Sequence, residues 1–143
     1  MRTVTDIEEE DPVSLTDDEL MVQANVPLAP YTTLGLGGPA RHFVACSSAE
    51  QIRAVLAYGV RQRQPVFIMG GGSNIVFPDA GYPGLVLRVA INHIELRDGT
   101  TEITAGAGAD WDALVRAAVE HGWTGVECLS GIPGTVGGTP IQN

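Results

Sequence analysis

The amino-acid sequence predicts an α+β fold, arranged as one domain or as two small lobes. Two segments, at 48–60 and 110–122, place apolar residues on one face of a helix. Short apolar runs bounded by glycine and proline lie around both segments, which is typical of strands. A chain of 143 residues with 44% hydrophobic content is long enough to bury a core. Helices packed on short strands are therefore expected.

The chain begins with an acidic segment. Residues 1–20 hold eight acidic residues and one arginine, so they account for −7 of the formal net charge of −9. Residues 1–24 are expected to form a poorly ordered lead with a short helix at 15–23, because Thr16 and Glu19 match a capping box. The rest of the chain shows no basic patch, so no nucleic-acid partner is expected. No apolar run reaches the ~18 residues of a membrane span, so no membrane partner is expected either.

Residues 25–78 are expected to form a first α/β lobe. Ser48 and Gln51 predict the start of a helix, because their side chains can satisfy its first backbone groups. An apolar stripe that faces a sheet then runs along this helix, formed by Ile52, Val55, Leu56 and Val60. Strand-like runs at 41–46 and 66–69 precede and follow the helix.

The segment 25–40 contains the pattern Gly-x-Gly-x-x-Ala, which is a dinucleotide-binding fingerprint in other folds. We reject this match for two reasons. Pro39 removes a backbone donor, and a strand-like run follows where the motif requires a helix.

The sequence Gly70-Gly71-Gly72-Ser73-Asn74 separates two apolar runs, 65–69 and 75–77, that are expected to be strands. A loop without Cβ atoms at three positions can turn its backbone N–H groups towards one point and let a bulky anion approach. We interpret the loop as a cradle for the pyrophosphate of a nucleotide cofactor. A tight turn, in which glycine only supplies a positive φ, explains the same residues from the loop alone.

Residues 79–143 are expected to form the first part of a second α+β lobe. Three short strands with a hairpin turn at 97–100 are predicted, at 85–89, 91–97 and 101–106. A second helix is predicted to begin after Asp110 and to end at Gly122. Its apolar stripe is formed by Trp111, Leu114, Val115, Ala118 and Val119.

The run Gly106-Ala107-Gly108 precedes this helix and invites a second dinucleotide interpretation. Trp111 occupies the third small position of that fingerprint, and the sheet here is expected to be antiparallel. A glycine-mediated crossing into the helix is therefore the simpler interpretation, although Gly108 still leaves room for a ligand.

The last stretch, 125–143, holds five glycines and two prolines with few charges. Pro133 suits the first turn of a short helix, whose free N–H groups would favour an anion or a polar ring edge. An ordinary loop between lobes is the alternative.

The cysteines and histidines are scattered singly along the chain. Cys46 and Cys128 stand in no metal-binding or redox spacing, which fits a reducing cytoplasm. The histidines are equally dispersed, at His42, His93 and His121, so no metal site is expected.

Taken together, these segments resemble the bacterial UDP-N-acetylenolpyruvoylglucosamine reductases, also called UDP-N-acetylmuramate dehydrogenases. The resemblance covers residues 25–143 and depends on the glycine loop together with the last stretch. The matching pieces, in the family's order, are Thr33…Gly37-Gly38-Pro39-Ala40, Gly70-Gly71-Gly72-Ser73-Asn74, Gly106-Ala107-Gly108…Trp111…Leu114-Val115, Gly125-Val126-Glu127, Ser130-Gly131-Ile132-Pro133-Gly134-Thr135-Val136-Gly137-Gly138 and Pro140-Ile141-Gln142-Asn143.

The resemblance implies an FAD-binding domain of the vanillyl-alcohol-oxidase (PCMH) type, with two lobes, the flavin between them and the second lobe truncated. It implies that residues 70–74 wrap the pyrophosphate of FAD. It also implies that residues 130–138 run beside the flavin, with Ile132 against the ring system. The implied cofactor-binding residues are Met69, Gly70, Gly71, Gly72, Ser73, Asn74, Ser130, Ile132, Pro133, Gly134 and Gly138.

The resemblance also implies an activity in peptidoglycan synthesis. In the family, NADPH reduces FAD, and the flavin passes a hydride to the enolpyruvyl group of a UDP-sugar, giving UDP-N-acetylmuramate. The family's catalytic serine, glutamate and arginine match no position up to Asn143, so no catalytic residue is assigned and Glu127 is interpreted as structural. Because these catalytic residues and the substrate domain are not in this chain, it is not expected to turn over alone. It is also expected to bind FAD weakly, because part of the lobe that covers the flavin ring is absent. Exposed strand edges of the truncated lobe favour dimerisation.

Two alternatives stay open at this point. One is another FAD-dependent oxidoreductase of the same fold; a covalently held flavin is disfavoured because no histidine occurs between residues 43 and 92. The other is a non-enzymatic nucleotide-binding module, which the absence of assigned catalytic residues supports.

Overall fold

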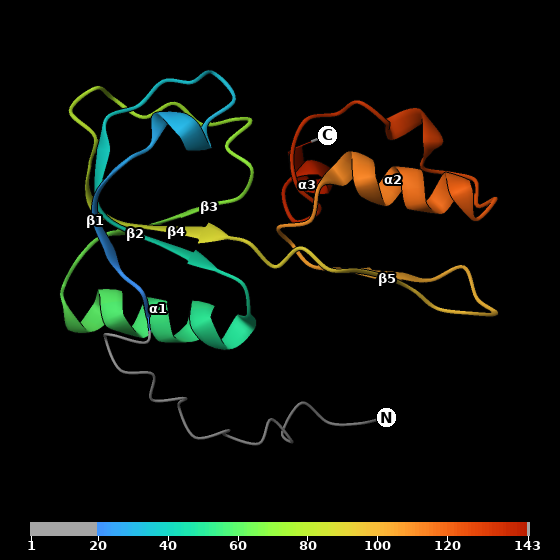
Figure 1. The fold of residues 1–143 in the computed structure, drawn as a ribbon, viewed down its shortest axis with the longest axis horizontal. Helices are drawn as coiled ribbons and strands as arrows, with labels where there is room; N and C mark the ends of the chain where they lie inside the picture. Colours follow the sequence, from blue (N-terminus) through green and yellow to red (C-terminus); the bar gives the residue numbers. More distant parts are fainter. Residues whose placement is uncertain (1–19, 143) are drawn as a thin grey trace.

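The computed structural model describes residues 20–142, which fold into two lobes (Figure 1). The first lobe holds a four-stranded sheet, and the second holds a two-stranded sheet with a helix alongside it. The strands are β1 (Gln23–Pro27), β2 (Pro39–Cys46), β3 (Val66–Met69), β4 (Tyr82–Val89), β5 (Ile94–Leu96) and β6 (Ile103–Ala105). The helices are α1 (Ala49–Arg61), α2 (Trp111–Glu120) and α3 (Thr139–Gln142), with 3-10 turns η1 (Ala29–Tyr31) and η2 (Glu127–Leu129).

The first sheet has the strand order β1-β2-β4-β3. β4 is parallel to both of its neighbours, and β1 joins the edge of the sheet antiparallel to β2. Because β2, β3 and β4 are parallel, their carboxyl ends meet at one edge of the sheet, which faces the second lobe (Figure 1). The loop 70–74 follows β3 at this edge, so the topology places it between the lobes.

The expected boundary between the lobes at residues 78 and 79 is wrong, because β4 lies inside the first sheet. Leu85, Val86 and Leu87 of β4 are all completely buried, which requires cover on both faces of the sheet. An uninterrupted apolar run of this kind is typical of a parallel strand in the middle of a sheet. The predicted strand at 85–89 is therefore confirmed, but it belongs to the sheet of the first lobe and not to the second lobe.

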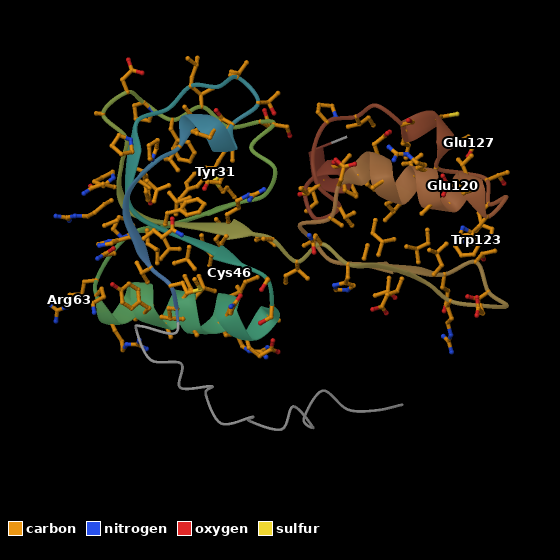
Figure 2. The ribbon with its side chains drawn as sticks, in the orientation of Figure 1. Tyr31, Cys46, Arg63, Glu120, Trp123 and Glu127 are labelled. Carbon is orange, nitrogen blue, oxygen red and sulfur yellow. The ribbon has the colours of Figure 1, made fainter. Side chains whose placement is uncertain are left out.

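Two apolar clusters form the core of the first lobe, one on each face of the sheet. The cluster towards α1 consists of Leu20, Val44, Cys46, Ala54, Val55, Leu85 and Leu87. The cluster on the opposite face consists of Leu28, Ala40, Phe43, Met69, Phe77 and Val86. Figure 2 shows Cys46 between the sheet and α1, and Tyr31 on the other side of the sheet. Both faces of this small sheet are therefore packed.

The start of α1 is as predicted. The Ser48 hydroxyl accepts a hydrogen bond from the backbone N–H of Gln51 at 3.2 Å, and the Gln51 side chain accepts one from the backbone N–H of Ser47 at 2.7 Å. The predicted apolar stripe holds along this helix except at Val60, which is 79% exposed. Gly59 is buried beside Val66 instead, because only a glycine fits that close approach to β3.

Two further predictions in the first lobe are wrong where the structure describes them. Residues 20–23 form a turn and the start of β1 rather than the end of a helix, and the remainder of the expected helix at 15–23 lies outside the described residues. Leu20 is 3% exposed, so the packed fold begins before the expected end of the lead at residue 24. The run 75–77 forms no strand; Phe77 is buried in the core while Val76 is 66% exposed.

The second lobe contains the predicted hairpin and helix. β5 and β6 pair antiparallel, and both strands are shorter than expected. The Asp110 carboxylate caps α2 by accepting a hydrogen bond from the backbone N–H of Ala113 at 2.8 Å. Gly122, with a φ of 70°, follows the end of this helix as predicted. The stripe is imperfect at its last member, since Val119 is 49% exposed.

No helix begins at Pro133, so this prediction is wrong. The segment from Ser130 to Gly138 contains turns and an isolated β-bridge between Thr135 and Asp110, and the short helix α3 begins at Thr139, with Pro140 in its first turn. The predicted space beside Gly108 is also filled: a Cβ there would lie 2.6 Å from the carbonyl oxygen of Val89. Gly108 thus serves close backbone packing between the end of β4 and the start of α2, as the simpler interpretation expected.

Candidate functional site

The first arm of the candidate site is the loop 70–74 at the carboxyl end of β3. Gly72 adopts a φ of 73°, which is the left-handed region that favours glycine. A Cβ on Gly72 would clash with the carbonyl oxygen of Tyr31. The carbonyl oxygen of Gly72 in turn accepts a hydrogen bond from the backbone N–H of Thr33 at 3.1 Å. Tyr31 at the end of η1 and Thr33 just after it therefore fix the position of Gly72 in the loop.

The second arm is the segment 134–139, which leads into α3. Its backbone is tied to the start of α2: Trp111 N–H donates to the carbonyl of Gly134 at 3.2 Å, and Val136 N–H donates to the carbonyl of Ala109 at 2.9 Å. Gly137 N–H also donates to the carbonyl of Ala107 at 2.9 Å. These bonds fix a glycine-rich segment that would otherwise have a large conformational freedom.

The two arms meet at Thr135. A Cβ on Gly70 would lie 2.7 Å from the Thr135 hydroxyl oxygen, and one on Gly71 would lie 3.2 Å from its methyl carbon. Gly134, with a φ of 143°, faces Ser73 across the same gap, where an added Cβ would lie 3.3 Å from the Ser73 hydroxyl oxygen. The first two glycines of the loop are therefore required for the close approach of the two lobes.

A small cavity of about 60 Å³ lies between the arms. Its lining consists of Gly70, Gly71, Gly72, Ser73, Asn74, Ile75, Gly134, Thr135, Gly138 and Thr139. Seven of these residues are predicted cofactor-binding residues, drawn from two segments far apart in the sequence. Ile75, Thr135 and Thr139 were missed, although the two threonines were visible in the sequence as the hydroxyl side chains of the second glycine-rich run.

The donor set of the cavity fits an anion. Within residues 20–142, no acceptor receives a hydrogen bond from the backbone N–H groups of residues 71–74. Hydroxyl groups of Ser73 and Thr135 and the amide of Asn74 stand beside these groups. Successive backbone N–H groups around glycines form concave sites for phosphate groups. The residues present therefore suit a phosphate or diphosphate group.

Four predicted residues, Met69, Ser130, Ile132 and Pro133, lie outside this lining. The Ser130 hydroxyl donates to the Asp112 carboxylate at 2.6 Å, and the backbone N–H of Gly131 donates to the same oxygen at 2.9 Å. These bonds, with Arg116 at 3.6 Å, lower the pKa of Asp112 below its ordinary value. Ser130 thus anchors the turn to α2, and Ile132 and Pro133 continue from that turn towards Gly134 without lining the cavity. Met69 lies in the core beneath the loop, at 2% exposure.

Glu127 has the structural role that was predicted. Its carboxylate accepts a hydrogen bond from the backbone N–H of Gly125. Hydrogen bonds from its own backbone and then from Gly125 lower the pKa of Glu127 below its ordinary value. Figure 2 shows Glu127 in the second lobe, away from the first lobe. The Trp111 indole N–H donates to the carbonyl of Leu129 at 2.9 Å, so η2 is held on α2.

A larger cavity, of about 550 Å³, lies in the second lobe between β6 and the end of α2. Its lining includes Ile103, Leu114, Ala118 and Trp123, and among the described residues no charged side chain contributes to it. This chemistry does not suit a phosphate group. The cavity between the arms is therefore the candidate site. In the described part of the chain, no three potential metal ligands cluster together and no helix is long and apolar enough to span a membrane.

Comparison with known proteins shows the family of this chain. Residues 40–143 match the model of a family described as the FAD binding domain. The chain belongs to the FAD-binding domain family. Membership confirms the predicted two-lobed fold of the vanillyl-alcohol-oxidase type and FAD as its cofactor.

Curated relatives of this chain include several UDP-N-acetylenolpyruvoylglucosamine reductases. UDP-N-acetylenolpyruvoylglucosamine reductase of Thermobifida fusca is 46% identical over 122 residues, which are 83% of this chain and 34% of the relative. The protein of the same name from Nocardia farcinica is 48% identical over 126 residues, 85% of this chain and 31% of the relative. The crystal structure of UDP-N-acetylenolpyruvylglucosamine reductase from Thermus caldophilus matches with a TM-score of 0.62 at 35% identity, covering 82% of this chain and 40% of that one.

The resemblance stated from the sequence is thereby confirmed over most of the chain. The chain spans about a third of the length of the curated relatives it matches, 34% for the protein of Thermobifida fusca. The matched part includes both arms of the candidate site.

Proposed function

We propose that this chain forms the FAD-binding part of a reductase that converts the enolpyruvyl ether of UDP-N-acetylglucosamine to UDP-N-acetylmuramate in peptidoglycan synthesis. NADPH is the proposed reductant, and the cytoplasm is the proposed location. The names of the relatives support the reaction, and the match to the FAD-binding domain family supports the cofactor. The whole enzyme would then be an oxidoreductase of cell-wall biogenesis, and through the cell wall it would contribute to cell shape and cell division.

The observation that carries the proposal is the pair of arms around Thr135. Gly70, Gly71 and Gly134 bring the loop after β3 and the segment before α3 together, and the N–H groups of residues 71–74 have no acceptor in the described part of the chain. Such dipoles can meet the charge of a diphosphate without a lysine, and the sequence contains none. We therefore assign the diphosphate of FAD to residues 70–74 and 134–139.

The protein's own contribution is to bind, orient and exclude water. FAD, when bound, supplies hydride transfer. The hydrogen bonds from Trp111, Val136 and Gly137 fix the second arm, and the bond from Thr33 to Gly72 fixes the first. Ser130 and Ile132 lie on the turn that Asp112 anchors, and we propose that this turn borders the flavin end of the cofactor.

We propose further that these 143 residues alone bind FAD weakly and do not turn over. None of the described side chains around the cavity is an acid–base group: the lining consists of glycine, serine, asparagine, isoleucine and threonine. Purified protein that carries stoichiometric yellow flavin would contradict the weak binding. Reduction of the enolpyruvyl UDP-sugar by NADPH with this chain alone would contradict the lack of turnover.

Self-association is also part of the proposal. β5 and β6 form a two-stranded sheet in the second lobe, so each strand has one unpaired edge among the described residues, and the side chains of Ile94 and Leu96 on β5 are partly exposed. An exposed edge strand with an apolar side chain is a template for pairing with another strand. Light scattering after size-exclusion chromatography is expected to show a dimer; a monomer at all concentrations would contradict it.

Titration with three ligands tests the cofactor assignment. FAD is expected to bind with one site per chain, and ADP-ribose is expected to compete because it carries the same adenosine diphosphate part as FAD. The UDP-sugar is not expected to bind this part of the enzyme. Binding of the UDP-sugar without binding of FAD would refute the proposal, and it would favour a different nucleotide-binding module.

A further inference from the structure

Arg88 is a half-buried cation that forms no ion pair within the described residues 20–142. In residues 20–142, Arg53, Arg97 and Arg116 form ion pairs with acidic side chains, whereas Arg41, Arg63 and Arg88 form none. Arg41 and Arg63 are exposed to water, but Arg88 is only partly accessible. A cation that leaves water without a compensating anion costs free energy. The surroundings of Arg88 are therefore suited to an anion that is not among residues 20–142.

The strand register puts Arg88 beside the glycine loop. Arg88 of β4 pairs with Met69, the last residue of β3, and Gly70 follows directly. Leu85 and Leu87 pack towards α1 and Val86 packs on the opposite face, so alternation along β4 places Arg88 on the face of Tyr31. The end of β4 points towards the second lobe (Figure 1). Arg88 thus lies at the same carboxyl edge as residues 70–74.

Tyr31 joins Arg88 to the loop. The central guanidinium carbon of Arg88 lies 5.4 Å from the centroid of the Tyr31 ring, and that ring stacks on Phe43 with 4.6 Å between centroids. The backbone carbonyl of the same Tyr31 packs against Gly72 so closely that no Cβ fits. An aromatic face holds a planar guanidinium in one orientation and leaves its N–H edge available for hydrogen bonds.

We infer that Arg88 is a further cofactor-binding residue, whose guanidinium donates hydrogen bonds to a diphosphate oxygen of the ligand held by residues 70–74. The inference rests on the proposed function of that loop. The backbone N–H groups supply dipoles but no net charge, whereas Arg88 supplies a full positive charge. Arg88 therefore selects ligands with a diphosphate over ligands that carry only a flavin ring.

Substitution of Arg88 tests the inference. Arg88→Gln removes the charge, and it is expected to weaken the binding of FAD and of ADP-ribose by roughly tenfold or more, as for loss of a charge-assisted hydrogen bond. Arg88→Lys keeps the charge and is expected to retain most of the affinity. Arg41→Gln makes the same chemical change on an exposed residue of the neighbouring strand β2, and its FAD affinity is expected to equal that of the unaltered chain.

Three readouts separate the outcomes. Circular dichroism without ligand shows whether each variant is folded; if Arg88→Gln is not, the comparison of Arg88→Lys with the unaltered chain and the salt dependence of FAD binding decide instead. Binding by the unaltered chain that weakens as NaCl is raised supports a cationic contact. FAD affinity unchanged in folded Arg88→Gln, or independent of salt, overturns the inference while the proposed function stands. Failure of the unaltered chain to bind FAD overturns the proposed function itself.

Discussion

At the scale of single residues, the loop after β3 depends on backbone geometry more than on side-chain chemistry. Gly72 combines a φ of 73° with close contact to the Tyr31 carbonyl, so it faces both a conformational and a steric demand. Gly99, in the hairpin turn between β5 and β6, has the same φ of 73° but no atom within 4 Å of an added Cβ. Comparing alanine substitutions at these two glycines therefore separates the effect of the positive φ from the effect of the steric contact with Tyr31.

Gly72→Ala is expected to destabilise the chain by more than the matched Gly99→Ala. The positive φ alone costs about 1–2 kcal/mol for a residue with a Cβ, and both variants incur it. Only Gly72→Ala must also displace the loop from Tyr31, so it is expected to lose most FAD binding while Gly99→Ala keeps it. Urea unfolding and FAD titration of both variants provide the measurement. Equal FAD affinity of the two variants would contradict this role of Gly72.

Asp112 carries a second prediction at this scale, because it anchors the turn at Ser130 and Gly131. Hydrogen bonds from these two residues, and the charge of Arg116, lower its pKa below 3.8. A carboxylate with a lowered pKa in the folded chain stabilises that chain above its ordinary pKa, and the stabilisation is lost as the pH falls through the folded value. Asp112→Ala is therefore expected to lower the melting temperature at neutral pH, with a difference that shrinks below pH 3.8.

Thermal unfolding by circular dichroism at neutral and acid pH measures this difference. Asp98→Ala, an exposed carboxylate in the hairpin turn, is the control and is expected to melt like the unaltered chain. A melting-temperature difference for Asp112→Ala that does not depend on pH would show that its carboxylate charge is not what holds the turn.

At the scale of elements, α1 contains a matched pair of valines. Val55 is completely buried against the sheet, whereas Val60 is 79% exposed one and a half turns later. Val55→Ala is expected to lower the free energy of unfolding by about 1–2 kcal/mol, since two buried methyl groups are lost and alanine favours the helix slightly. Val60→Ala is expected to change it by less than about 0.5 kcal/mol. Urea unfolding of both variants measures this, and equal effects would place the buried face of α1 elsewhere.

The elements that the sequence predicted correctly are those that neighbouring residues specify. Ser48 and Asp110 cap their helices through bonds to backbone groups three residues later, and such bonds are readable in the sequence. The strand at 75–77 and the helix at Pro133 were wrong because long-range contacts decide those segments. Phe77 packs into the core of the first lobe from a segment without regular structure. The backbone N–H groups of Val136 and Gly137 donate to carbonyl groups just before α2, at Ala109 and Ala107, instead of forming helical hydrogen bonds.

The candidate site divides in the same way. The loop 70–74 was predictable because three adjacent glycines are a local signal. Thr135 was missed because its importance arises only where the two arms meet. The bond from the Ser130 hydroxyl to Asp112 joins residues 18 positions apart, so it too was not readable from neighbouring residues. The assignment of β4 to the first sheet likewise depends on which strands become neighbours, and sequence order gives no information about that.

At the scale of the whole molecule, the two cysteines report on folding of the first lobe. Burial raises the pKa of the Cys46 thiol to about 11, whereas Cys128 on η2 is exposed. Because the thiolate is the reactive form, one thiol per chain is expected to react with a disulfide reagent at neutral pH, and the second only in denaturant. Mass spectrometry of the labelled chain identifies the site. Fast labelling of Cys46 in the native chain would contradict the packing of α1 on the sheet.

The two lobes are joined where the carboxyl edge of the first sheet meets the segment before α3. This arrangement brings residues 70–74 within contact of residues 134–139, although more than half of the second lobe lies between them in the sequence. Residues of both arms line the cavity, so cofactor binding is expected to require both lobes.

The most direct test of the proposed diphosphate site is a titration of the isotopically labelled chain with FAD, followed through its backbone amide resonances. We expect FAD to shift the N–H signals of residues 71–74 most, together with signals of residues 134–139. ADP-ribose is expected to shift the same set. Signals of the β5–β6 hairpin turn at Gly99 are expected to stay in place. FAD-induced shifts elsewhere that leave the signals of residues 71–74 unmoved would contradict binding of the diphosphate at this loop.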